Sequence, residues 1–477
     1  MRNKILALLL FLSLGAGLHA QATLQVFNGD DPGEGFNDPT PASPIGGNPG
    51  VTVGQQRQIA FLYTASLWGQ QLTSSQTIRV LAFFDALNCT ATSATLGAAA
   101  PYRSFANYPA AAGFPGTLSN TWYPAALAEK LTGEDIGAEF EDNFELFAFF
   151  NSSLGNEGCL TGGGWYYGLD NNPPAGQSNL VAVLLHEFGH GLGFTVGPTN
   201  AATGARAGAS AYPSVWEMNM KDLSSRKTWF QMTDAQRAAS AQNTNFLVWA
   251  GRHTVLASRF VLDPSAEFVA WAPRSVRGEY EAQPATFGPP LRYLGLRDIL
   301  VPAYDAVGVS TDACEPLPRH GPNSVKGRIA LIDRGTCTFV VKVKNAQDAG
   351  AVAAVIANNV PVGLPGMAGT DPSITIPSIG ISQELGNALR ALPQLDNHGR
   401  AGLPVALRLS TSYKLGLQSG FPRLYAPNPY QPGSSVSHWD TTLTPNQLME
   451  PFINSDLTQS LTPPQDLTFP LLRDIGW

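Results

Sequence analysis

The residues best equipped for chemistry are His186, Glu187 and His190, which lie together in the pattern His-Glu-Phe-Gly-His. The apolar run before them, residues 180–185, contains no helix breaker and predicts a helix that continues through the motif. On a helix, residues four positions apart share one face, so His186 and His190 could present two imidazoles to one metal ion. Glu187 would then reach a water molecule on that metal. This H-E-x-x-H spacing is typical of zinc peptidases, in which the glutamate is the general base.

Histidine is scarce in this chain, with 7 residues in 477, so the motif is unexpected by chance. A structural alternative is that both histidines belong to a buried core helix. Buried imidazoles need hydrogen-bond partners, and two stacked ones need several, which makes this alternative costly.

Two further segments resemble those of leishmanolysin-like metzincins. Gly193 stands three residues after His190, where the metzincin clan has a glycine that lets the chain turn. In most of the clan a third His or Asp follows three residues later, but this chain has Val196, which cannot bind zinc. Leishmanolysin-like enzymes instead carry the third histidine after a long insertion, in a Ser-His-Trp segment, followed by a methionine turn. The resemblance therefore implies His438 as the third zinc ligand and Met449 as the turn methionine.

The same resemblance implies an α+β fold, with a metzincin-like zinc peptidase domain built from a mixed sheet and the active-site helix. The residue patterns agree with an α+β fold, because residues 54–69 have the apolar spacing of a helix and residues 77–86 look like a buried strand. Residues 142–150 predict a second strand before the motif. That strand could border the cleft and bind substrate backbone, or it could be an ordinary core strand.

The long insertion contains a segment similar to the protease-associated (PA) domain, including Arg334-Gly335-x-Cys337-x-Phe339. A strand over Ile329–Ile332 and a helix over residues 339–349 surround these residues. The resemblance spans roughly residues 295–410 and implies a β-rich module without catalytic residues. A nucleotide site of the Rossmann type is the competing interpretation, but the required glycine cluster is missing.

The chain therefore divides into four segments: a signal peptide at residues 1–22, a peptidase part at 23–294, the PA-like insertion at 295–410, and a second peptidase part at 411–477. The signal peptide is indicated by Arg2 and Lys4, an apolar run of about ten residues and Ala20-Gln21-Ala22. That run is too short to span a membrane, and no later segment is apolar enough. We expect an exported protein, secreted or periplasmic.

Four cysteines fit export, because disulfides persist outside the cytosol. The sequence allows three pairings, and proximity favours Cys89–Cys159 and Cys314–Cys337.

Charged residues make up only 14% of the chain, while 48 Gly and 37 Pro favour loops and β structure. The formal net charge of −7 gives no indication of nucleic-acid binding. Residues 28–38 are dense in glycine and carboxylates, and predict either a Ca²⁺ loop or a solvated turn.

These observations predict a secreted zinc metalloendopeptidase with one catalytic Zn²⁺, acting on protein or peptide substrates. Two alternatives remain. In a gluzincin-type peptidase, a downstream helical glutamate is the third ligand, and Glu217 is its candidate. In a non-catalytic protein, the PA-like module would bind partners on a peptidase scaffold, although the intact His, Glu and His set argues against this.

Overall fold

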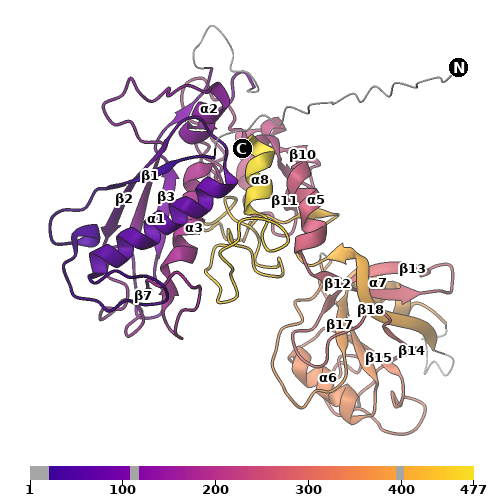
Figure 1. The fold of residues 1–477 in the computed structure, drawn as a ribbon. Coiled ribbons are helices and arrows are strands. Elements are labelled where there is room, and N and C mark those ends of the chain that lie inside the picture. The colour runs from indigo at the N-terminus through magenta and orange to yellow at the C-terminus, as the bar shows by residue number, and fades with distance from the viewer. Residues whose placement is uncertain (1–20, 108–117, 362, 394–401) are drawn as a thin grey trace, which may run out of the picture.

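The computed structural model describes residues 21–107, 118–361, 363–393 and 402–477. It consists of an α+β unit, made from both ends of the chain, and a β-barrel inserted between them (Figure 1). Most of the expected signal peptide, residues 1–20, lies outside the described residues. Among the described helices, none is both long and apolar enough to cross a membrane.

A four-stranded mixed sheet forms the base of the first unit. Its order is β1-β2-β6-β3, with the first three strands parallel and β3 antiparallel at one edge. Alternate side chains of β2 are buried, so one face of the sheet is covered and the other is partly open. The strands are β1 (Leu24–Asn28), β2 (Ile78–Asp85), β3 (Gly97–Pro101) and β6 (Leu146–Asn151).

Two helices cover the buried face of this sheet: α1 (Val53–Gln71) and α3 (Leu180–Leu192). Phe61 of α1 packs edge-on against Phe150 of β6, with ring centroids 5.1 Å apart, and also contacts Phe188 of α3. Such aromatic packing buries large apolar areas. The expected helix over 54–69 and the expected strand over 77–86 both agree with the structure. The second strand begins at Leu146, later than the expected 142.

The remaining part of this unit is poor in regular structure. The terminal helix α8 packs on α5, and the indole of Trp477 donates a hydrogen bond to the Leu192 carbonyl at 2.8 Å, which ties the chain end to α3. The helices of this region are α2 (Ala125–Thr132), α4 (Asp234–Ser240), α5 (Arg252–Val261) and α8 (Thr468–Ile475). Its short strands are β4 (Ser104–Phe105), β5 (Tyr123–Pro124), β7 (Trp165–Tyr166), β8 (Ser178–Asn179), β9 (Met220–Asp222), β10 (Lys227–Thr228), β11 (Leu247–Trp249), β19 (Leu417–Gln418) and β20 (Phe421–Pro422).

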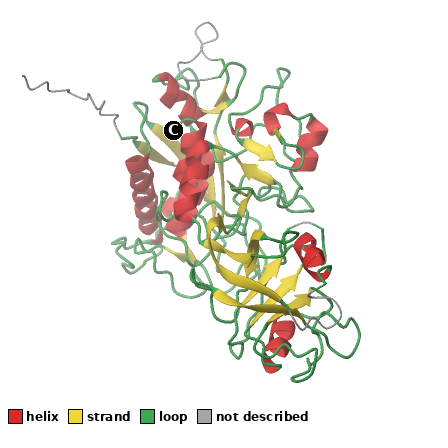
Figure 2. Cartoon of the chain, turned by 90° about the vertical axis from the view of Figure 1, so that its right-hand side faces the viewer, coloured by secondary structure: helices red, strands yellow, loops and turns green. Residues whose placement is uncertain are grey.

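The inserted unit is a closed seven-stranded barrel of order β12-β13-β17-β16-β15-β14-β18. Its two helices lie on the outside of the strands (Figure 2). The strands are β12 (Pro264–Ala270), β13 (Gly278–Pro284), β14 (Leu296–Pro302), β15 (Ile329–Asp333), β16 (Ala353–Ala357), β17 (Ser378–Ile381) and β18 (Leu403–Lys414), and the helices are α6 (Phe339–Asp348) and α7 (Gln383–Arg390). The barrel takes in β12 and β13, so it begins before residue 295, where the sequence placed the start of the module.

The chain enters and leaves the barrel at one place. The Leu415 amide donates to the Asp263 carbonyl at 2.9 Å, and the Asp263 amide donates to the Thr444 carbonyl at 2.7 Å. Adjacent entry and exit points are what an inserted domain requires, because the host fold is then not pulled apart.

Two disulfides lie in different units. Cys89 is bonded to Cys159 beside the mixed sheet, and Cys314 is bonded to Cys337 in the barrel unit, with Cα atoms 5.0 Å and 5.7 Å apart. These are the two pairs that sequence proximity favoured.

Candidate metal centre

Helix α3 carries the His-Glu-Phe-Gly-His motif and is buried along its whole length. The Asn179 side chain caps its start by accepting from the amides of Val181 and Ala182. The helix ends at Gly193, whose φ of +123° a residue with a side chain rarely adopts. The glycine lets the chain turn immediately after His190.

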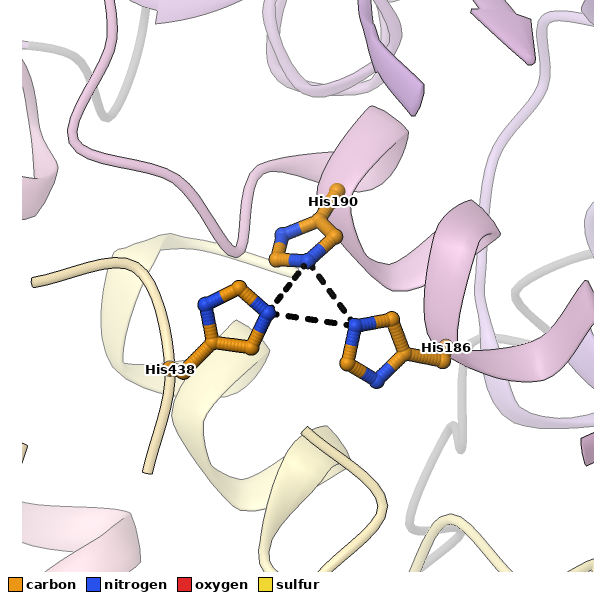
Figure 3. A group of neighbouring side chains, drawn as sticks. All are labelled: His186, His190 and His438. Carbon is orange, nitrogen blue, oxygen red and sulfur yellow. Dashed lines mark hydrogen bonds between the residues drawn. The ribbon is translucent and has the colours of Figure 1, made fainter. Parts of the chain in front are cut away.

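Three imidazoles meet at the end of this helix: His186 and His190 from α3, and His438 from the C-terminal loop region (Figure 3). Their Nε2 atoms form a triangle with sides of 3.1, 3.2 and 3.2 Å. All three side chains are buried. The structure thus brings together residues separated by 248 positions in the chain.

The opposite ring nitrogens fix how each imidazole is protonated. Nδ1–H of His186 donates to the Leu448 carbonyl at 2.7 Å, and Nδ1–H of His190 donates to the Phe194 carbonyl at 2.7 Å. His438 donates in the same way to the Ser434 carbonyl at 2.8 Å. A carbonyl can only accept, so the proton of each neutral ring is on Nδ1 and a lone pair is on Nε2. Three lone pairs therefore face one point and cannot hydrogen-bond to one another.

The three rings are neutral at ordinary pH. Burial lowers the pKa of His186 to about 4. Burial, and then the charge of His186, lowers the pKa of His190 to about 3. The pKa of His438 is lowered well below its ordinary value by burial and by the charges of the other two histidines. Neutral imidazole is the form that binds a metal.

This donor set fits a Zn²⁺ ion. A tetrahedral site with Zn–N distances of about 2.0–2.1 Å places neighbouring nitrogens about 3.3 Å apart, close to the sides of the observed triangle. The backbone carbonyls that accept from Nδ1 are the outer partners that orient zinc-bound histidines in proteins. A site with three protein ligands leaves a position for water or substrate.

Glu187 is buried and lines the same cavity as the three histidines. Burial raises its pKa to about 8, and the Ala99 amide on β3 acts in the opposite direction. Gly97 on the same strand leaves room for this side chain, because a Cβ there would lie 2.9 Å from Glu187 Cγ. Edge strand β3 therefore packs against the glutamate of the motif, a relation that the sequence did not predict.

Met449 lies against the turn of α3 that joins His186 to His190. A Cβ added to Gly189 would lie 2.7 Å from Met449 Sδ, so the glycine between the two histidines allows the thioether to approach. The Met449 carbonyl accepts from the Trp439 amide at 2.8 Å, which joins this turn to the segment carrying His438. The predicted turn methionine thus packs beside the site.

Asp466 is a part of the site that sequence reasoning missed. Its carboxylate is buried and accepts from the Leu448 amide at 2.8 Å and from the Thr468 amide at 2.7 Å. The carbonyl of Leu448 in turn accepts from His186. No spacing pattern in the sequence marks Asp466, because its burial and its hydrogen-bond donors are set by tertiary packing.

The structure contradicts the alternative that Glu217 is the third ligand. Its carboxylate is fully buried and accepts from Arg206 at 2.7 and 3.0 Å, from the Thr199 hydroxyl at 2.6 Å and from the Ser214 amide at 3.2 Å. Both carboxylate oxygens of Glu217 are therefore occupied by hydrogen bonds to residues other than the three histidines. Glu217 anchors a loop.

The calcium interpretation of residues 28–38 is not supported by the contacts. Both oxygens of Asp30 accept from backbone amides, those of Phe36 at 2.7 Å and Phe84 at 2.8 Å, while the Asn28 side chain bonds to Asn37. These hydrogen bonds stabilise the turn and occupy the oxygens of Asp30 that a Ca²⁺ ion would need. A separate group of carboxylates consists of Glu129, Asp135 and Glu145, and Arg79 forms ion pairs with the latter two.

A cavity of about 1190 Å³ contains the site. Its walls come from the approach to β3 and the strand itself, from the loop after α3, and from the loops around His438 and after Met449. Tyr430 lines it, while the hydroxyl of Tyr425 bonds to Gln431. The lining segments are residues 92–99, 173–179, 195–197, 432–435 and 450–455. The cavity runs along an edge strand and is large enough for several residues of a peptide.

Comparison with known proteins identifies one part of the chain. The family model of the PA domain matches residues 300–389, the stretch that contains β15, α6, β16 and β17. The expected PA-like module is therefore present.

Curated relatives match only short stretches. Leucine aminopeptidase 2 of Trichophyton equinum is 44% identical over 71 residues, which is 15% of this chain and 14% of that protein. "Receptor homology region, transmembrane domain- and RING domain-containing protein 1" of Oryza sativa subsp. japonica is 38% identical over 107 residues, covering 22% and 19%. The chain thus spans less than a fifth of the length of these relatives. Among solved structures, a zinc aminopeptidase from Bacillus subtilis is 25% identical over 33% of this chain and 36% of that chain, with a TM-score of 0.22.

Proposed function

We propose that this chain is a zinc-dependent peptidase of the metzincin type, with the PA-containing barrel inserted into its catalytic unit. The observation that carries the proposal is the convergence of three neutral imidazoles, each with its lone pair free, beside a buried glutamate in a long cavity. The Met449 turn and the position of His438 after the insertion support the metzincin type over the gluzincin type.

In this proposal His186, His190 and His438 hold one zinc ion, with the carbonyls of Leu448, Phe194 and Ser434 orienting the rings. When bound, zinc supplies Lewis acidity, which polarises a peptide carbonyl and acidifies water. The carboxylate of Glu187 takes the proton of the attacking water and passes it to the leaving amine. The cost of burying Glu187 raises its pKa into the range useful for such proton exchange.

We further propose that the substrate lies extended along β3. This strand is at the edge of the sheet, with β6 on one side only, and it lines the cavity next to Glu187. An edge strand has unpaired backbone groups that can bind a peptide as an additional strand. Because backbone pairing does not require a free peptide end, the arrangement favours endopeptidase activity.

Export through residues 1–22 belongs to this proposal as well. Two disulfides fit a chain that works outside the reducing cytosol. The PA domain, remote from the imidazoles in sequence and built on its own barrel, would serve as a binding module or a lid.

Hydrolysis of matched peptides tests the proposal. We expect the zinc-loaded chain to cleave an internally quenched peptide with an acetylated N-terminus, and to lose this activity when the metal is chelated and regain it when zinc returns. Cleavage of amino-acid nitroanilides without cleavage of the blocked peptide would replace the endopeptidase by an aminopeptidase. No hydrolysis of either substrate by protein that retains zinc would favour a non-catalytic binding protein.

A further inference from the structure

A second group of acidic side chains lies in the barrel unit, in the loop between β14 and β15. Asp305, Asp312 and Glu315 each offer a carboxylate oxygen, and these oxygens all lie within 4.8 Å of one another. The group is in the region matched by the PA domain model.

Asp305 is the unusual member of this group. It is 8% exposed, and neither of its oxygens has a hydrogen-bond partner in the described structure. The amides of Glu315, Val307 and Ala313 face the carboxylate and act to lower its pKa, yet none reaches hydrogen-bond geometry. Burial, followed by the charge of Asp312, outweighs them and raises the pKa. A buried carboxylate without a partner is costly and calls for a cation.

Lys342 supplies only part of that positive charge. Its ammonium group is buried and donates to the Asp312 carbonyl at 2.6 Å and to Cys314 Sγ at 3.2 Å, and it is 4.0 Å from Asp312 Oδ2. Asp312 also accepts from the Cys314 amide at 3.1 Å. Three carboxylates against one ammonium leave two negative charges, which equals the charge of one divalent cation.

We propose that Asp305, Asp312 and Glu315 form a Ca²⁺ site. The ligands are hard oxygens, and separations of up to 4.8 Å match oxygens placed around one ion at Ca–O distances of about 2.3–2.6 Å. Mg²⁺ requires a tighter octahedron at about 2.0–2.1 Å, and Zn²⁺ prefers the nitrogen and sulfur ligands that this site lacks, since Cys314 is in a disulfide. The ion would brace the loop that carries Cys314 against α6.

A competing explanation is that Asp305 is protonated and Lys342 alone balances the group. In that case calcium would add nothing, and replacing Asp305 by Asn would leave calcium binding and calcium-dependent stability unchanged. The two explanations therefore differ in a binding measurement that does not depend on peptidase activity.

The test is calcium titration of the zinc-loaded full chain, freed of calcium beforehand, by calorimetry and by thermal unfolding. Tb³⁺ luminescence is a second readout, because Tyr304 directly precedes Asp305 and can sensitise a bound lanthanide. The variants are Asp305→Asn and Glu315→Gln. Glu315 is half-exposed, so its variant keeps the test valid if Asp305→Asn does not fold. Glu384→Gln, an exposed carboxylate on α7 outside the group, is the matched control.

We expect one Ca²⁺ per barrel site, a higher melting temperature with about 1 mM calcium, and affinity weakened at least about tenfold in each variant but not in the control, as expected when a charged ligand is removed. Tb³⁺ emission should be displaced by Ca²⁺ and only weakly by Mg²⁺. Absence of calcium binding to the unaltered chain, or equal binding by both variants, would overturn the assignment.

Discussion

His186, Glu187 and His190 owe their arrangement to helix α3, but the direction of each ring is set by residues elsewhere in the chain. The carbonyls of Leu448 and Phe194 fix the two imidazoles of the motif. The catalytic role proposed for Glu187 and the orienting role of Asp466 can each be tested by a substitution that keeps the size of the side chain.

Glu187→Gln should keep zinc and lose about two to four orders of magnitude in hydrolysis, because only the general base is removed. Metal content and turnover of the same blocked peptide measure the two effects. Near-normal turnover in this variant would show that another group accepts the proton.

Asp466→Asn should weaken zinc binding and lower the free energy of unfolding by about 1–3 kcal/mol, because one of two backbone amides then faces an NH₂ group instead of an oxygen. Zinc affinity by competition with a chelator, together with denaturant unfolding, provides the measurement. Asp456→Asn, the same change at an exposed site nearby, is the control and should alter neither quantity. If zinc affinity is unchanged while stability falls, Asp466 supports the fold without orienting His186.

At the scale of elements, the helices and strands that have a clear local apolar pattern were predicted correctly from the sequence. The apolar pattern predicted α1, α3 and β2. The approach of β3 to Glu187 could not be predicted, because the pairing of Gly97 with Phe150 is a tertiary contact. β13, with the sequence GEYEAQP, lacks the composition of a buried strand and is recruited by pairing with β12 and β17.

The position of His438 next to α3 is likewise a tertiary contact that local sequence patterns cannot predict. No local pattern connects it to α3, and only the resemblance of its Ser-His-Trp context to a known family pointed to it. Glu217 was an equally permissible ligand by residue type. What excludes it is the ion pair with Arg206, a contact between two loops that carries no signal in the spacing of residues.

Helix α2 allows a prediction about pH. Burial, and then the charge of Glu145, raises the pKa of Glu129 to about 8 from an ordinary value of 4.5. Because the folded state holds this proton more tightly, its contribution to stability is complete below pH 4.5 and is lost as the pH rises toward 8 and beyond. Glu129→Gln removes the titration and can keep the hydrogen bond that Gly137 donates.

We therefore expect the melting temperature of Glu129→Gln, relative to the unaltered chain, to be higher at pH 8.5 than at pH 5.5. Calorimetric scans of the zinc-loaded proteins at both values measure this difference. A difference that does not depend on pH would mean that Glu129 is ionised across this range in the folded protein.

At the scale of the whole molecule, the barrel is joined to the α+β unit at one place, where Asp263 and Leu415 are hydrogen-bonded to each other. Its two apolar clusters consist of barrel residues, and the cluster of the first unit contains none of them. Each unit thus has its own core, as independently folding domains do.

Replacing residues 264–414 by a short Gly-Ser linker should therefore leave a folded protein that binds zinc, because Asp263 and Leu415 are already hydrogen-bonded neighbours. Zinc content and cleavage of short against long substrates would be compared with those of the full chain. We expect zinc to be retained and substrate preference to change. A soluble shortened chain without zinc would show that the barrel is needed to build the site.

The most direct test of the account is the zinc content of purified His438→Ala after dialysis, measured beside the unaltered chain, Glu217→Gln and His320→Ala. His320 is an exposed histidine in the barrel unit and serves as the matched control. We predict one zinc ion per chain in the unaltered protein and in both of the other variants, and a strong loss in His438→Ala, because two imidazoles with waters make a poor zinc site. Full zinc occupancy in His438→Ala, or its loss in Glu217→Gln alone, would contradict the assignment of the metal centre.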